Sequence, residues 1–407
     1  MAHAIHDFTA KLRQPSLAPH VDAYVRWRRA VRSARERGEP VPSAPDLAPI
    51  SINLDLTTAC NYACTHCIDW DILNTRHKYK EAELRDSLTL MAERGLRSVI
   101  LIGGGEPTLY PRFASFVSFL KELGLQVSIV SNGSRCDRLA EAVVHMDERD
   151  WIRLSLDSGS NELFVKMHKP ADKKLDLDSI CEGVGEIKRA NPRVLVGFSY
   201  IIVWSGASRD DHEILENIHE IVQATERAKR YGFDYISLKP ILERETNGAE
   251  VMDPEKTRSE TATVVQRIRH EVDRAQELAD ESFQVYESNN LRVLEQGNWH
   301  EFTHQPRTCH MQALRQVLTP TGLYNCPAHR GVEKARLGSP TAYRDGQEAA
   351  ATNASLTQIL DGFDASHECR NVTCIYNSVN WWLEKLIEDP REDVRVEIGE
   401  ERADFFL

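Results

Sequence analysis

The chain has 407 residues, a formal net charge of −12 and 41% hydrophobic residues. This length predicts two or three domains, or one large domain with a satellite. No long Lys/Arg tract occurs, so nucleic acid is a poor default partner. The N-terminal residues lack an apolar signal core and no run of 18 apolar residues exists, so we expect no membrane span and a cytoplasmic location.

In chain order, residues 1–48 combine a charged helical pattern with a Pro-rich connector, which we interpret as an N-terminal helical extension and linker. Residues 49–250 alternate short β-rich runs with longer amphipathic runs. The strands are expected at 51–57, 98–104, 126–132, 151–157, 194–203 and 234–241, with helical patterns near 80–94, 111–123, 136–146, 175–190 and 208–231. We expect a bridging helix in 251–298, a cysteine-rich unit in 299–390 and a C-terminal tail in 391–407.

Six β–α repeats predict an α/β fold with a parallel sheet and crossover helices. An open six-stranded barrel and a doubly wound sheet both fit this pattern. We favour a partial (β/α)6 TIM-like barrel because of the residues that follow the strands. In such folds the chemistry lies at the carboxyl ends of the strands.

Nine cysteines occur, an odd number whose tight local spacing favours metal or redox chemistry over disulfides. Cys60, Cys64 and Cys67 directly follow the first strand. A structural zinc site or a closed iron–sulfur cluster normally has four ligands. Three thiolates can instead hold three irons of a [4Fe–4S] cube, leaving one iron for a small molecule with N and O donors. The alternative is a zinc site completed by His66 or by a distant residue.

Polar loops follow the next three strands as well. The Gly-rich turn lets backbone approach a small molecule closely, and Glu106 or nearby carbonyls are candidates to receive an ammonium group. Ser155 and Asp157 are candidates to bind hydroxyls, although helix capping is an alternative role for the strand-end polar residues. The candidate cofactor-binding residues are Gly103, Gly104, Gly105, Glu106, Ser131, Asn132, Ser155 and Asp157.

The combination of Cys60-x3-Cys64-x2-Cys67, Gly104-Gly-Glu-Pro107 and the Ser-Leu-Asp strand end resembles the radical S-adenosylmethionine (SAM) enzymes, over roughly residues 50–245. His66 takes the place of the aromatic residue that usually precedes the third cysteine. The resemblance implies a SAM-binding [4Fe–4S] cluster that reduces SAM to methionine and a 5′-deoxyadenosyl radical, which abstracts a hydrogen atom from substrate. It also implies a flavodoxin- or ferredoxin-type reductant.

A second set comprises Cys309, Cys326, Cys369 and Cys374, with Gly322 predicting a tight hairpin between the first two. This set resembles the abbreviated SPASM-type (twitch-like) auxiliary modules of the same enzymes, which implies a second, fully ligated [4Fe–4S] cluster. The gap between Cys369 and Cys374 is less typical, so one ligand of this set is open to question. A structural zinc site remains the alternative. The remaining Cys181 is expected in the core.

For catalysis, the candidates are Cys136 as a hydrogen-atom donor, Lys239, Glu243 and Arg244 as a base or an anion-binding group, and Tyr200 facing the same region. A solvated strand exit is the alternative for the charged group, and a helix start for Cys136. We expect an oxidoreductase or epimerase acting on a small carbohydrate, aminocyclitol or nucleotide-sugar-like molecule in biosynthesis, by dehydrogenation, epimerisation or a related rearrangement. A maturase of ribosomal precursor peptides and a non-catalytic metal-binding scaffold are the alternatives.

Overall fold

The computed structural model describes residues 7–209, 212–244, 248–257 and 259–407. A ten-stranded sheet in the order β11-β8-β5-β4-β3-β2-β1-β12-β13-β14 forms its centre. All pairs from β11 to β12 are parallel, and the β12–β13 and β13–β14 pairs are antiparallel. The strands are β1 Ser51–Leu54, β2 Ser98–Leu101, β3 Gln126–Ser131, β4 Trp151–Ser155, β5 Leu195–Ile202, β8 Tyr235–Pro240, β11 Gln284–Glu287, β12 Arg315–Thr319, β13 Gly322–Tyr324 and β14 Arg336–Gly338.

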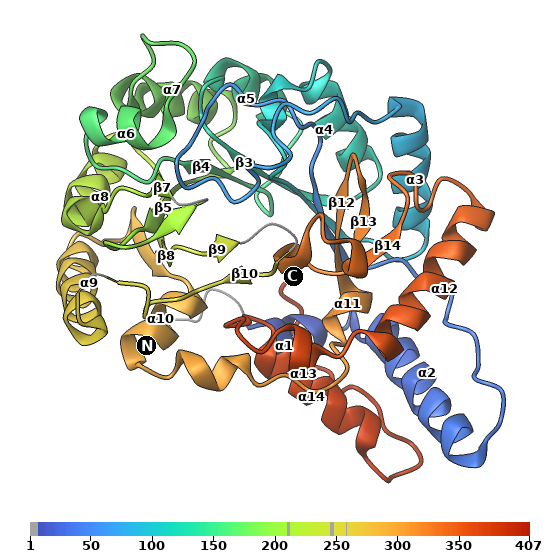
Figure 1. Cartoon of the computed structure of the whole chain (residues 1–407). Coiled ribbons are helices and arrows are strands. Elements are labelled where there is room, and N and C mark those ends of the chain that lie inside the picture. The colour runs from blue at the N-terminus through green and yellow to red at the C-terminus, as the bar shows by residue number, and fades with distance from the viewer. Residues whose placement is uncertain (1–6, 210–211, 245–247, 258) are drawn as a thin grey trace.

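All six predicted β-rich runs form strands of this sheet. The sheet curls into a partial barrel with helices outside (Figure 1). The α/β partial-barrel prediction is therefore confirmed. The outer helices are α3 Glu81–Glu93, α4 Phe113–Glu122, α5 Cys136–Val143, α6 Asn161–His168, α7 Leu177–Ala190 and α8 Ile221–Arg230.

Side chains alternate along each strand, and this alternation separates the core from the lumen. On β3, Val127 and Ile129 are fully buried in the core, whereas Val130 lines a cavity inside the barrel. On β4, Ile152 and Leu154 are fully buried in the core, and the alternating residues Trp151, Arg153 and Ser155 line the cavities of the lumen. The lumen is therefore open to polar side chains while the outer face packs under the helices.

Two segments differ in secondary structure from the prediction made from the sequence. The predicted helix over 208–231 begins only at Ile221, because Ser208–Arg209 and His212–Glu213 form the small ribbon β6–β7. The expected bridging helix over 251–298 contains α9 Thr261–Gln276, strand β11 and α10 Asn289–Gln296. A second ribbon pairs β9 Glu243–Arg244 with β10 Glu250–Val251.

The cysteine-rich unit and the chain ends pack onto the barrel. Strands β12–β14 continue the barrel sheet beyond β1, and the unit also contains α11 Met311–Leu314, α12 Gly346–Gly362, α13 Ala365–Glu368 and α14 Asn377–Glu388. The N-terminal helices α1 Phe8–Leu12 and α2 Ala18–Arg37 pack against α14. Figure 1 places the C-terminus within the ring of elements, where Ser98 Oγ donates to the Phe405 carbonyl at 2.7 Å.

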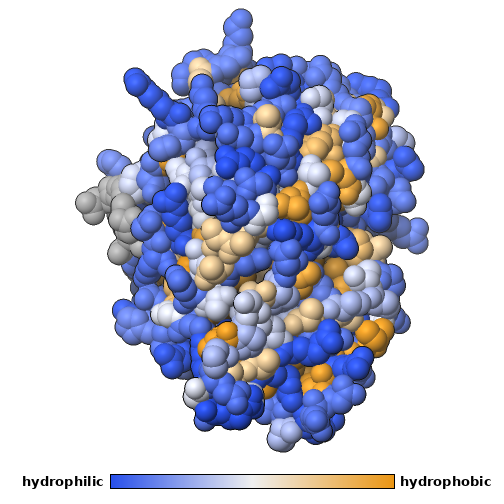
Figure 2. Space-filling view, turned by 90° about the vertical axis from the view of Figure 1, so that its right-hand side faces the viewer, coloured by the Kyte–Doolittle hydropathy of each residue, from blue (hydrophilic) through white to orange (hydrophobic). Residues whose placement is uncertain are grey.

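The surface is mostly hydrophilic, with apolar side chains in separate spots (Figure 2). None of the described helices is both long enough and apolar enough to cross a membrane.

Candidate functional site

The first cysteine loop is held against the end of α6. The amide of Ala63 donates to the His168 carbonyl at 3.2 Å, and the amide of Thr65 donates to the Met167 carbonyl at 2.8 Å. Burial raises the pKa of Cys67 to about 12 and raises that of Cys64 well above its usual value. Because metals bind the thiolate, binding at this loop must release protons.

Glu106 organises two of the strand-end turns. Its Oε1 accepts hydrogen bonds from the Thr108 amide (3.0 Å), the Thr108 hydroxyl (2.6 Å) and the Ser131 hydroxyl (2.8 Å), and its Oε2 accepts from the Asn132 amide (2.7 Å). The residue is 2% exposed. Its acceptor sites are occupied by these donors within the protein, so it positions the two turns. The expectation that Glu106 or a nearby carbonyl receives a ligand's ammonium stays a prediction.

The three glycines of the turn are required for contacts within the protein. A Cβ on Gly103 would lie 2.4 Å from an Arg330 guanidinium nitrogen, and one on Gly104 would lie 2.9 Å from Asp55. A Cβ on Gly105 would lie 2.4 Å from a backbone oxygen of the cysteine loop. The turn therefore packs directly on β1, on the cysteine loop and on the C-terminal unit, and the glycines permit this approach.

A cavity of about 460 Å³ lies at the carboxyl ends of the strands. It brings together two of the first cysteines, three of the four predicted strand-end polar residues and one of the predicted cations. Its wall is completed by the start of α10 and by Ile375, the neighbour of Cys374 in the second cysteine set. The lining includes Cys64, His66, Cys67, Asn132, Ser155, Asp157, His168, Lys239, Glu250, Ser288, Asn289, Asn290 and Ile375.

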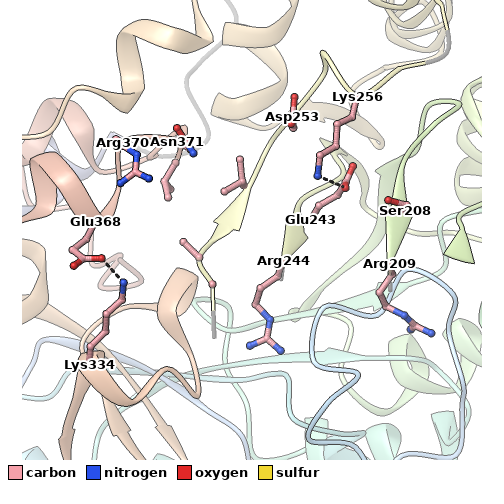
Figure 3. Close-up of a pocket in the computed structure, with 14 residues that line it drawn as sticks. Ser208, Arg209, Glu243, Arg244, Asp253, Lys256, Lys334, Glu368, Arg370 and Asn371 are labelled. Atoms are coloured by element: carbon pink, nitrogen blue, oxygen red, sulfur yellow. Dashed lines mark hydrogen bonds and ion pairs between the residues drawn. The ribbon is translucent and has the colours of Figure 1, made fainter. Parts of the chain in front are cut away.

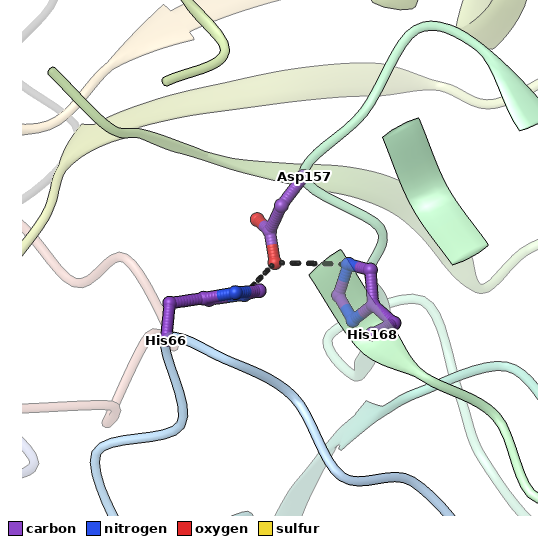
Figure 4. A group of neighbouring side chains, drawn as sticks. All are labelled: His66, Asp157 and His168. Carbon is purple, nitrogen blue, oxygen red and sulfur yellow. Dashed lines mark hydrogen bonds and ion pairs between the residues drawn. The ribbon is translucent and has the colours of Figure 1, made fainter. Parts of the chain in front are cut away.

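Two histidines flank Asp157 in this cavity (Figure 4). Asp157 Oδ2 lies 3.0 Å from His66 Nε2 and 3.5 Å from His168 Nε2, and Oδ1 accepts from the Ile201 amide at 2.7 Å. Burial alone would raise the pKa of Asp157, but the His66 contact and the other contacts bring it below its usual range. Burial lowers the pKa of His168 to about 4, so His168 is neutral.

Asp157 and the two histidines hold one another in place beside the first cysteine loop. His168 Nδ1 lies 3.3 Å from Cys64 Sγ, and its Nε2 lies 2.9 Å from the Leu156 carbonyl. Asp157 has a left-handed backbone conformation, with φ of 47°. Such a conformation is uncommon for a non-glycine residue, and here it turns the carboxylate toward His66. The orientation of the His66 ring beside the cysteine loop is thus set by Asp157.

The second cysteine set surrounds one cavity, which all four thiols line. The Asn380 side-chain amide donates to Cys309 Sγ at 3.3 Å, and the Tyr376 amide donates to Cys374 Sγ at 3.4 Å. Burial raises the pKa of Cys326 to about 12. The four cysteines predicted to act together are therefore brought together, including the pair with the unusual gap.

A buried ionic network joins the first cysteine loop to the C-terminal unit. Arg330 follows Cys326 by one short turn, η4 Pro327–His329. Its Nη1 donates to both Asp69 oxygens at 2.7 Å, and its Nε lies 3.3 Å from Asp55. All three side chains are at most 10% exposed. The network fixes the position of one cysteine set relative to the other.

Glu243 and Arg244 lie outside the strand-end cavity, at a second, more polar opening of about 750 Å³ (Figure 3). Glu243 pairs with Lys256 at 3.3 Å, and Arg244 pairs with Asp71 and donates to the Arg330 carbonyl at 3.1 Å. Both charged groups thus have partners at this opening. Lys239, by contrast, faces the strand-end cavity, with its Nζ donating to Ser199 Oγ at 3.2 Å.

Two catalytic candidates are misplaced. Tyr200 was expected to face the site, but it is fully buried and its hydroxyl donates to the Asn217 carbonyl at 2.6 Å. Its neighbour Ile201 lines the cavity, so strand alternation turns Tyr200 outward. Cys136 Sγ lies 3.3 Å from the Gly133 carbonyl and packs between α5 and α7, away from the cavity. Neither residue is in a position for the predicted role. Cys181 is fully buried, as expected.

Sequence reasoning missed Glu250, Arg330 and Arg153. Glu250 lies after a loop and lines the strand-end cavity, and burial raises its pKa to about 7. The only signal for Arg153 was its place two residues before Ser155, on the same face of β4. No local pattern marks Arg330, whose role depends on the folded contact.

The comparisons with known proteins agree with this geometry. Residues 54–218 match the family model of the Radical SAM superfamily. An S-adenosylmethionine-dependent nucleotide dehydratase from Thermoplasmatales archaeon (strain ISO4-H5) is 40% identical over 112 residues, which is 26% of this chain and 38% of that protein. A GTP 3′,8-cyclase from Chlorobaculum tepidum is 32% identical over 118 residues, 28% of this chain and 35% of that protein.

Mycofactocin maturase MftC from Mycobacterium ulcerans is 29% identical over 116 residues, 28% of this chain and 31% of that protein. The chain thus spans less than two fifths of the length of these three curated relatives. The fold is similar to that of Streptococcus suis SuiB bound to S-adenosylmethionine, with a TM-score of 0.55 at 13% identity over 92% of this chain and 80% of SuiB. Residues 54–218 are thus similar to the Radical SAM superfamily, and the partial-barrel fold of the chain is similar to that of SuiB.

Proposed function

We propose that the protein is a radical SAM enzyme that abstracts a hydrogen atom from a small-molecule substrate. The observation that carries this proposal is the strand-end cavity, where Cys64 and Cys67 meet the polar ends of three other strands. In the proposal, Cys60, Cys64 and Cys67 hold a [4Fe–4S] cluster, and SAM lies among Asn132, Ser155 and Asp157. The cluster and SAM together supply a 5′-deoxyadenosyl radical when bound.

The chain's own groups are suited to orienting the cofactor and excluding water. Glu106 fixes the Ser131 and Asn132 turn, and Asp157 orients His66. The cavity wall is mostly apolar away from these groups, with Ile201, Ile241 and Leu242 on one side. Such a wall keeps water from a reactive intermediate.

A second [4Fe–4S] cluster on Cys309, Cys326, Cys369 and Cys374 is the corresponding proposal for the C-terminal unit, which we infer to be an abbreviated SPASM-type module. The support for this proposal is that all four cysteines line one cavity. A cluster held there would supply electron-transfer chemistry. A flavodoxin- or ferredoxin-type reductant for the first cluster belongs to the same proposal.

We infer that Glu250 is the base that takes a proton from the substrate. It lines the cavity on β10, which packs against η4 beside Cys326. None of the described residues forms a hydrogen bond or ion pair with its carboxylate, so it is available to substrate. With its pKa raised to about 7 by burial, a proton can be taken up near neutral pH. This assignment replaces Glu243 and Arg244, which are engaged at the other opening.

Anaerobic reconstitution tests the cofactor assignment. Two clusters predict about eight irons per chain. A content of about four irons would contradict the second cluster, and zinc in place of iron would contradict the proposed mechanism. Changing Cys60, Cys64 and Cys67 together to Ala should abolish SAM cleavage while the absorbance of the second cluster remains. SAM cleavage by that variant would show that the first site is misassigned.

A peptide maturase is the second candidate, because MftC and SuiB are among the similar proteins, and a structure of SuiB with its precursor peptide SuiA also matches this fold, with a TM-score of 0.51 at 14% identity. The small-molecule proposal is supported by the relatives named nucleotide dehydratase and GTP cyclase, at higher identity. Deuterium transfer into 5′-deoxyadenosine decides between them. Transfer from a labelled carbohydrate or nucleotide supports the first proposal; transfer only from a labelled peptide reverses the ranking.

A further inference from the structure

The barrel lumen contains three cations on its inward face. Arg153 lies on β4, Lys239 on β8 and Arg315 on β12. Arg153 and Arg315 line a cavity of about 520 Å³ in the lower part of the barrel, and Lys239 lines the strand-end cavity above it. Ile375 borders both cavities, so the two abut inside the barrel.

None of these cations has a carboxylate within 4.0 Å among the residues that the structure describes. Arg153 lies over the rings of Trp151 and Tyr235, at 4.6 and 5.9 Å from their centroids, and its buried Nε has no hydrogen-bond partner in the described part of the chain. Lys239 donates to the Ser199 hydroxyl.

Arg315 donates to the Tyr376 hydroxyl and, at 2.6 Å, to Asn53 Oδ1, and its Nε also has no partner among the residues that the structure describes. Of the three cations, Arg315 is buried, and Arg153 and Lys239 are half-buried. A charge removed from water without a close counter-charge is costly, and such cations are ordinarily paired.

Two of the carboxylates that line these cavities have partners of their own among the described residues. Asp157 binds His66 and the Ile201 amide, and Asp404 pairs with Lys11 at 2.8 Å on the floor of the lower cavity. Glu250 faces the strand-end cavity and, among the described residues, is the second acidic group in its lining beside Asp157. Burial, and to a smaller extent repulsion by the Arg153 charge, lower the pKa of Lys239, and the Asp157 carboxylate acts in the opposite direction.

We propose that Arg153 and Lys239 form a subsite for an anionic group of the substrate, a phosphate or a carboxylate, with Arg315 as a third cation below them. An anion between the two would supply a close counter-charge and accept hydrogen bonds from the N–H donors that the protein leaves open. The bound anionic group would anchor the substrate in the lumen, so that the reacting carbon of the substrate lies in the strand-end cavity. This assignment rests on the proposed function for the place of the chemistry, and it gives Lys239 an anion-binding role.

Isothermal titration of the SAM-loaded holoenzyme with inorganic pyrophosphate and with citrate tests the subsite, because the two probes separate phosphate from carboxylate preference. We expect one-site binding of at least one probe. Arg153→Gln and Lys239→Met should weaken it by tenfold or more, while Arg153→Lys retains most of it. Arg370→Gln, at the polar opening of Figure 3, is the matched control and should leave the affinity within twofold.

Absence of one-site binding by both probes would overturn the inference. So would equal loss of binding in Arg370→Gln and the lumen variants, because the anion would then lie at the opening. Thermal unfolding identifies any variant that fails to fold. In that case the test rests on Arg153→Lys, which keeps the charge and should retain most of the probe binding. A wild-type protein that binds pyrophosphate but does not cleave SAM would retain this subsite and overturn the proposed function.

Discussion

Replacing Arg330 by Met removes the buried guanidinium that joins the two cysteine-bearing units. The pair with Asp69 has N–O distances of 2.7 Å, and both side chains are at most 10% exposed. Charges about 4 Å apart attract by about 4 kcal/mol at an effective dielectric constant of 20, and breaking a buried pair typically costs about 3–5 kcal/mol. Asp55 adds little, because burial raises its pKa to about 8 and it is largely protonated at pH 7.

The expected loss can be converted to a melting temperature. At about 2.1 cal/mol/K per residue, unfolding 407 residues has an entropy of about 0.85 kcal/mol/K, so a loss of about 4 kcal/mol lowers the midpoint by about 5 °C. Differential scanning calorimetry of the apoprotein at pH 7 measures this shift. Lys334→Met is the control, because Lys334 forms a half-exposed pair with Glu368 in the same unit and should shift the midpoint by less than about 1 °C.

A double-mutant cycle identifies the partner. In an Asp69→Asn background, Arg330→Met should cost at least about 2 kcal/mol less than in the wild type, because the carboxylate left unpaired is then absent. An Arg330→Met midpoint equal to that of the Lys334→Met control would refute the reasoning that this network joins the units.

Three further predictions follow from the geometry. Glu106→Gln should weaken SAM binding by tenfold or more, because an amide loses acceptor capacity for the two turns; unchanged binding by titration would contradict the positioning role. Asp55→Asn should remove a pH dependence of stability. The pKa of Asp55 is higher in the folded than in the unfolded state, so its stabilising contribution is present at pH 4 and is lost as pH rises through about 8. The unfolding midpoints of wild type and variant, measured from pH 5 to 9, should therefore converge at acid pH, and the variant should have the higher midpoint at alkaline pH. Tyr200→Phe and Cys136→Ala should leave turnover and product unchanged, and a changed product from Cys136→Ala would restore it as a hydrogen donor.

Much of the scaffold could be read from the sequence because its signals are local. Six apolar runs separated by amphipathic segments predict a parallel sheet, and all six became strands. The spacing of Cys60, Cys64 and Cys67 with the glycine turn of the next strand placed both at one edge of that sheet. The second cysteine set was likewise predicted as a group, and its four thiols line one cavity.

The tertiary structure decided what each strand-end residue faces. Strand alternation has a period of two, so a shift of one residue sent Tyr200 to the core and left Ile201 in the cavity. The Glu106 carboxylate accepts hydrogen bonds from neighbouring turns, which come together because two strands are adjacent. Glu250, Arg330 and the unpaired Arg153 have no local motif.

The sequence by itself therefore determined the barrel, the two cysteine sets and the class of cofactor chemistry that they suit. Only the folded chain decided which charges are paired and which are left facing the lumen, because pairing joins residues such as Asp69 and Arg330 that are 261 positions apart. Burial then sets the protonation and the energetic cost of each group, and burial is a property of the packed structure rather than of any segment of the sequence.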